Sequence, residues 1–108
     1  MASVDYMKAL DIIADSLSAD QEIHVEPRSN DLKTLSVTMK GIKGELRTFV
    51  LIIEDYRLKI EIPGSYLPGK KPDAWLRDLE FRLEQAFLVN IYVDVEKKGE
   101  ILHITLAF

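Results

Sequence analysis

Three closely spaced strand patterns constrain the fold of this chain more than any other feature of its sequence. Residues 33–40 (KTLSVTMK) and 57–63 (RLKIEIP) alternate apolar and polar side chains, as strands with one buried face do. Residues 45–54 (ELRTFVLIIE) lie between them and carry apolar side chains on both faces. The links GIKG and DY are too short for the crossover that parallel strands need. The sequence therefore predicts an antiparallel meander.

Two amphipathic helices and a terminal hairpin are predicted around this meander. Apolar residues recur at helical spacing over residues 3–18 and 72–87. Residues 88–95 and 101–108 alternate like paired strands, and residues 22–27 (EIHVEP) allow one more short strand. The predicted fold class is α+β: an antiparallel sheet of five to six strands with two helices packed on one face, in the order α-(β)-β-β-β-α-β-β.

The composition narrows the class of protein. A length of 108 residues predicts a single domain over residues 1–108. A net charge of −4 disfavours nucleic-acid binding through the overall field, and the lack of cysteine excludes disulfides, thiolate catalysis and Cys-based metal sites. No leader pattern and no membrane-length apolar run is present, so a cytoplasmic protein is expected. Few amides and many charges are typical of thermophilic or archaeal proteins.

One motif suggests nucleotide chemistry. Residues 64–71 (GSYLPGKK) fit the spacing G-x-x-x-x-G-K of a phosphate-binding loop, between a predicted strand and a predicted helix. However, Lys71 stands where a Ser or Thr would hold magnesium, and Pro72 removes a backbone N–H from the phosphate cradle. A nucleotide-binding enzyme is therefore the second alternative, and the preferred interpretation is a loop that offers Lys70 and Lys71 to an anion or an acidic partner.

The strongest candidate for a binding surface is the middle strand of the meander. Its alternate residues Arg47, Phe49, Leu51 and Ile53 share one face, and Tyr92 of the hairpin is expected to join them there. An apolar stripe of this kind marks a partner surface when it is exposed. The alternative is that the N-terminal helix or the segment after it covers this face within one chain. If the stripe is exposed, it predicts a homodimer or a protein partner.

The same region allows a second interpretation. Phe49 and Tyr92, flanked by Arg47, Arg57 and Lys59, suit a sheet that stacks bases and contacts phosphates. Single-stranded nucleic-acid binding is therefore the first alternative, disfavoured by the negative net charge. His24 and His103 are 79 positions apart without ligand spacing, so no metal, cofactor or catalytic residue is predicted.

The order of elements resembles that of the dimeric secretion chaperones, in which a helix, a three-strand meander, a helix and a hairpin follow one another. These proteins are small, acidic and non-enzymatic, and they hold extended clients on sheet and helix surfaces. This chain differs in ending on a strand at Phe108, without their C-terminal helix. The resemblance implies a non-catalytic interaction module, adaptor-like or chaperone-like. This function agrees with the leading prediction from the residues.

Overall fold

The computed structural model describes residues 4–19, 22–41, 43–67 and 72–108. Its helices are α1 (Tyr6–Ser16) and α2 (Pro72–Phe87), and a short 3-10 turn covers Gly64–Tyr66. Its strands are β1 (His24–Pro27), β2 (Thr34–Lys40), β3 (Leu46–Ile53), β4 (Arg57–Pro63), β5 (Tyr92–Lys98) and β6 (Ile101–Ala107). No helix in the described part of the chain is long and apolar enough to cross a membrane.

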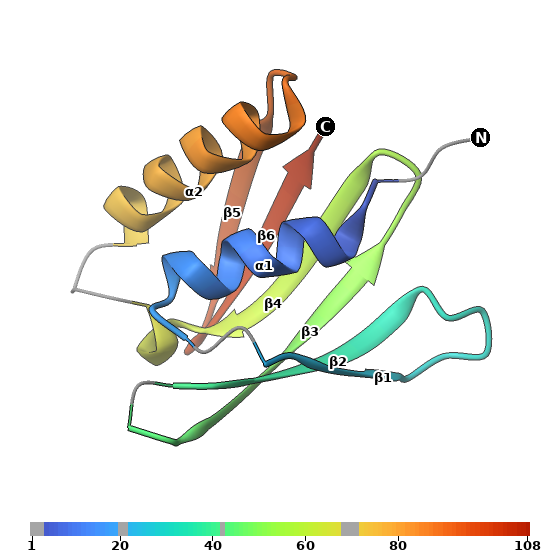
Figure 1. The fold of residues 1–108 in the computed structure, drawn as a ribbon, viewed down its shortest axis with the longest axis vertical. Coiled ribbons are helices and arrows are strands. Elements are labelled where there is room, and N and C mark those ends of the chain that lie inside the picture. The colour runs from blue at the N-terminus through green and yellow to red at the C-terminus, as the bar shows by residue number, and fades with distance from the viewer. Residues whose placement is uncertain (1–3, 20–21, 42, 68–71) are drawn as a thin grey trace.

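All six strands form one antiparallel sheet in the order β1-β2-β3-β4-β6-β5. Both helices lie on the same face of this sheet, and the other face carries no helix from the described part of the chain (Figure 1). The predicted α+β class is confirmed, and residues 22–27 do supply a sixth strand, β1. This strand is short and ends at Pro27, because proline has no N–H to continue the ladder.

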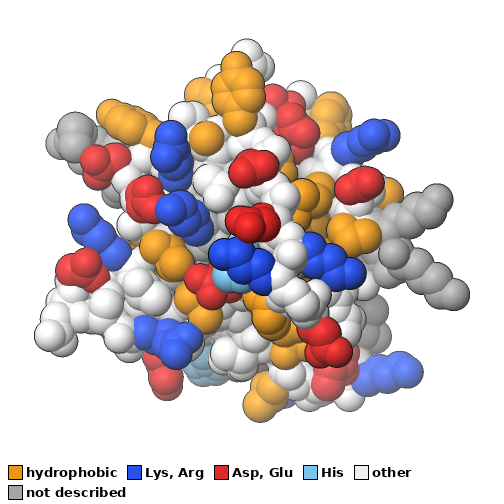
Figure 2. Space-filling view, turned by 180° about the vertical axis from the view of Figure 1, so that it is seen from behind, with side chains coloured by type: hydrophobic (Ala, Val, Ile, Leu, Met, Phe, Trp, Pro, Cys, Tyr) orange, Lys and Arg blue, Asp and Glu red, His pale blue; other side chains and the backbone are white. Residues whose placement is uncertain are grey.

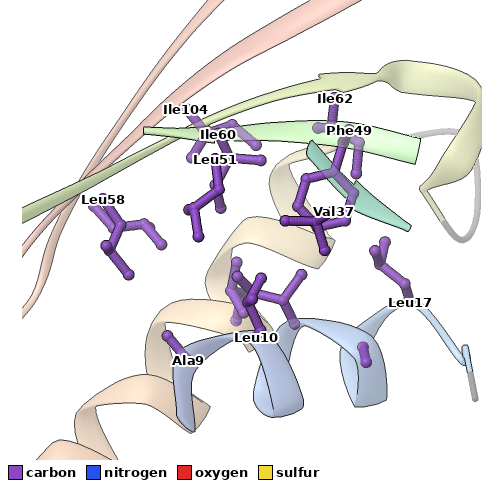
Figure 3. Close-up of a cluster of buried hydrophobic side chains, with 14 of the residues drawn as sticks. Ala9, Leu10, Leu17, Val37, Phe49, Leu51, Leu58, Ile60, Ile62 and Ile104 are labelled. Atoms are coloured by element: carbon purple, nitrogen blue, oxygen red, sulfur yellow. The ribbon is translucent and has the colours of Figure 1, made fainter. Parts of the chain in front are cut away.

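The hydrophobic core lies between the helices and one face of the sheet. Strands β2, β4 and β6 each bury alternate residues, as their sequence patterns predict. Leu10 of the first helix and Leu17, just after its end, approach this face from the opposite side (Figure 3). Burial of each large apolar side chain contributes about 1.5–3 kcal/mol, so the interlocking of helices and sheet is the main source of stability.

Hydrogen bonds fix both ends of α1. The Asp5 side chain accepts a hydrogen bond from the backbone N–H of Lys8 at 3.2 Å and so caps α1. At the other end, Ser18 adopts a left-handed φ of 55°, and the Ala19 N–H returns to the Ala14 carbonyl at 2.9 Å. This bond closes a Schellman motif. Ser3, a predicted start of this helix, lies outside the described residues.

The predicted bounds of the first hairpin strand are wrong. Residues 88–91 connect α2 to the sheet, and the strand continues instead to Lys98. Leu88 has a left-handed φ of 57°, and the N–H of Ile91 donates to Oε2 of Glu84 at 3.0 Å, which holds this connection outside the ladder. Val89, the second residue of that predicted strand, is consequently 45% exposed.

Candidate interaction surfaces

The predicted apolar stripe on β3 is part of the core. Phe49 is 2% exposed and Leu51 is 0% exposed, and Ile53 packs against the same core from the end of the strand. Their face of the sheet is the one that the helices cover (Figure 3). The expectation that Phe49, Leu51 and Ile53 present an open partner surface is therefore wrong. The alternative of coverage within one chain is correct, with helix α1 providing the cover.

Arg47 has a structural role at the end of the same strand face. Its Nη1 donates to the carbonyls of Leu17 at 3.4 Å and Tyr66 at 3.2 Å, and its Nη2 pairs with Glu45 at 3.0 Å. The guanidinium also lies 5.7 Å from the centre of the Tyr66 ring. These contacts tie the end of α1 to the segment after β4. The guanidinium of Arg47 is therefore engaged within the chain and is not free for the predicted role in partner binding.

Three further predicted site residues, Arg57, Lys59 and Tyr92, lie on the open face of the sheet. The ladder sets Arg57, Ala107 and Tyr92 in one row across β4, β6 and β5, and Lys59 stands in the next row. Phe49 belongs to the opposite face, so the predicted grouping of Phe49 with Tyr92 is wrong. Figure 2 shows the open face, where basic, acidic and hydrophobic side chains are interspersed.

Two adjoining hollows surround Arg57. The larger, about 590 Å³, lies at the end of the sheet beside the turn that joins β3 to β4. The smaller, about 420 Å³, lies over β4, β6 and β5. Both are lined by Arg57 and Ala107, while Tyr56 lines the first and Tyr92 lines the second. We call Lys33, Tyr56, Arg57, Lys59 and Tyr92 the Arg57 surface.

The electrostatics of the Arg57 surface centre on one carboxylate. The Lys59 ammonium lies 2.8 Å from Oε1 of Glu54. This hydrogen bond lowers the pKa of Glu54 below its ordinary value, and the positive charges of Lys59, Arg57 and Lys33 act in the same direction. No ion pair of Arg57 is found among the described residues. The Arg57 guanidinium is therefore available to an outside carboxylate or phosphate.

A second exposed apolar surface lies on α2. Phe81 is 61% exposed and Leu88, just after the helix, is 86% exposed. Beside Phe81 runs a groove of about 380 Å³ between the two helices, lined by Ile12, Asp15, Phe81, Arg82, Gln85 and Ala86. The sequence pattern did not predict this surface, because helical periodicity in α2 follows only its wide buried stripe. The signal in the sequence is a phenylalanine that falls outside that stripe.

The other predicted site residues either lie outside the described part of the chain or do not come together in one site. Lys70 and Lys71 lie outside the described residues. The strand before Gly64 is antiparallel to both of its neighbours, whereas a phosphate-binding loop follows a parallel strand. Within the described part of the chain, no three His, Asp or Glu side chains lie close enough to share a metal ion.

Comparison of the chain with known protein families, with curated proteins and with solved structures found no match. A function for this chain therefore has to come from the chemistry of its own surfaces.

Proposed function

We propose that this chain is a non-catalytic protein-binding module that holds its partner on the Arg57 surface. The observation that carries the proposal is the placement of two exposed tyrosines, Tyr56 at 57% and Tyr92 at 75%, on either side of an unpaired arginine. Tyrosine and arginine are the side chains that most often dominate binding energy at protein interfaces. The two hollows around Arg57 give side chains of a partner a place to insert.

The charge of this surface points to the kind of partner. Three cations, Lys33, Arg57 and Lys59, surround Glu54 on a chain whose net charge is −4. Asp55 and Asp94 line one hollow each, so the surface favours a single well-placed carboxylate at Arg57 rather than a highly acidic segment. A partner segment with a carboxylate beside an aromatic or aliphatic residue complements this arrangement. The carboxylate would pair with Arg57 in the fork geometry that guanidinium favours, and the apolar residue would contact Tyr92.

The test is retention of a partner from the native cell on immobilised chain, followed by titration of the purified partner. Replacement of Arg57 by Ala should weaken binding roughly ten- to thirtyfold, as loss of a central interface arginine does. Lys40→Ala is the matched control, because Lys40 is an exposed cation at the far end of β2 on the same open face. A partner that Arg57→Ala and Tyr92→Ala retain as well as the natural chain would contradict the proposal.

Single-stranded nucleic-acid binding is a second candidate that uses the same residues. Tyr92 beside Arg57 and Lys59 favours it, since bases stack on aromatic rings and phosphates pair with cations. Glu61 and Asp94 also lie on the open face. Their carboxylates repel phosphates, so this function is the second candidate. It predicts salt-dependent binding of a labelled oligonucleotide, lost in Arg57→Ala. Oligonucleotide binding without a protein partner would reverse the order of the two candidates.

A further inference from the structure

The outer side of α2 carries a line of apolar residues that the fold does not use. Ala74 and Phe81 are seven residues apart, which keeps them on one side of the helix, and Leu88, seven residues further on, is the first residue after its end. Ala74 is exposed, and so are Phe81 and Leu88. The buried stripe of α2, which contains Leu79 and Leu83, faces the sheet on the other side. We call Ala74, Phe81 and Leu88 the α2 crest.

Leu88 combines an exposed side chain with a left-handed backbone. It occupies the left-handed position that ends α2, where its N–H returns to the Glu84 carbonyl at 2.9 Å. Glycine is the usual residue at this position, because a side chain is strained there. A strained and exposed leucine serves neither the backbone nor the core. Leu32 is also strained and exposed, so what distinguishes Leu88 is its place at the end of α2, in line with Ala74 and Phe81.

We propose that the α2 crest binds the α2 crest of a second copy of this chain, with the two helices antiparallel and the two Phe81 rings meeting at the two-fold axis. In this arrangement Ala74, seven residues before Phe81, faces Leu88 of the second copy, seven residues after it. A small residue thus meets a large one at each end of the contact. The groove beside Phe81 gives the second ring room to turn.

The charges along the crest fit the same symmetry. Arg77 and Glu84 lie four residues before and three residues after Phe81, on the same flank of the crest. In an antiparallel pair, that flank faces its own copy, so Arg77 lies within about one residue rise, ~1.5 Å along the axis, of Glu84 in the second copy. Two such pairs form per dimer. No ion pair of Arg77 within its own chain is found among the described residues.

The expected dimer is weak. A 16-residue helix is about 24 Å long, so a contact limited to one helix per copy falls at the small end of specific interfaces. Measured by sedimentation equilibrium from about 1 µM to about 200 µM, the mass should rise from one chain toward two. Phe81→Asp and the milder Phe81→Ser should stay at one chain throughout. At about 1 µM, where the natural chain is expected to be a monomer, both should keep its far-UV spectrum and melting temperature, because Phe81 is 61% exposed.

A charge exchange between two variants tests the arrangement itself. Arg77→Glu alone and Glu84→Lys alone place like charges together at both symmetric contacts, so each should associate roughly tenfold more weakly than the natural chain. Because Glu84 also accepts the Ile91 N–H at 3.0 Å, the far-UV spectrum of each variant at about 1 µM is first matched to that of the natural chain. An equimolar mixture of the two should form a one-to-one heterodimer, because both contacts then join opposite charges. A natural chain with the mass of one copy at about 200 µM would overturn the proposal. A mixture no more associated than its components would also overturn it.

Discussion

At the scale of single residues, a buried hydrogen bond joins the two helices. The hydroxyl of Ser16 donates to the Ile13 carbonyl at 2.7 Å and accepts from Nε1 of Trp75 at 3.0 Å. Both side chains are buried, and Ser16 is the polar member of an otherwise apolar layer in the described structure. An indole N–H in such a layer needs an acceptor, since an unpaired donor loses its hydration without compensation. Ser16 supplies that acceptor from α1 to α2.

Ser16→Ala should therefore lower the free energy of unfolding by about 1–3 kcal/mol, the cost of leaving a buried donor unpaired. Urea unfolding followed by far-UV circular dichroism measures this difference. In a Trp75→Phe background no N–H remains to be satisfied, so the same serine replacement should cost less. An equal loss in both backgrounds would show that the hydroxyl acts through Ile13 rather than through Trp75.

Sequence patterns are a good guide to the elements of this protein, except where two faces look alike. Strands β2 and β4 were predictable because only one of their faces is apolar. Strand β3 is different: Phe49 and Leu51 face the helices, while Val50 and Ile52 on its other side are also apolar and only half-buried. Alternation cannot say which of two apolar faces a helix covers, and that choice depends on tertiary packing.

The start of β5 was unpredictable for a related reason, whereas the predicted end of α2 at Phe87 is confirmed. Residues 88–95 alternate well enough to be a strand. What removes the first four from the sheet is the left-handed turn at Leu88 and the hydrogen bond from Ile91 to Glu84, neither of which a pattern of apolar residues encodes. The Arg57 surface was partly predictable, because Arg57, Lys59 and Tyr92 were expected on the open face. Tyr56 and Lys33 join them only through the folded end of the sheet.

At the scale of the elements, β5 is one of the two edge strands of the sheet. Its outer backbone groups are unpaired by any described strand, since the sheet order ends at β5. Val93 and Val95 lie on its helix side, where Lys97 pairs with the buried Leu102. A charge on the inward side of an edge strand opposes the addition of another strand. We therefore expect Lys97 to oppose the pairing of this edge with a second sheet.

Lys97→Val should make β5 continuously apolar on its helix side and should promote assembly through the sheet edge. Static light scattering should detect species larger than two chains at concentrations where the natural chain shows none. Lys98→Val is the matched control, because it removes the same charge from the other face of the strand. Equal assembly of the two variants would mean that net charge, rather than the inward lysine, protects the edge.

At the scale of the whole molecule, the two proposed surfaces occupy different sides. The α2 crest lies on the helix layer, whereas the Arg57 surface spans the open face and one end of the sheet. A crest-to-crest dimer therefore leaves both Arg57 surfaces uncovered. Two linked sites bind a partner that has two matching segments more tightly than one site does, because the second contact is intramolecular. Dimer formation and partner binding would then strengthen one another.

Glycine variants of Leu88 and Leu32 separate the effect of Leu88 on folding from its effect on dimer formation. Both leucines have left-handed φ values, 57° and 60°, and both are exposed, by 86% and 61%. Replacement of either by glycine removes the same backbone strain, and the larger entropy of glycine in the unfolded chain offsets part of the gain. Each variant should thus raise the free energy of unfolding of the monomer by about 0.5–1 kcal/mol.

The two variants should differ only when the chain is concentrated. Association of folded copies stabilises the natural chain as its concentration rises, by mass action. Leu32 is not part of the crest, so Leu32→Gly should keep this concentration dependence in thermal unfolding. Leu88→Gly removes a residue that would contact Ala74 of the second copy, so its melting temperature should change little with concentration. Parallel behaviour of the two variants would mean that Leu88 carries strain without contributing to a dimer.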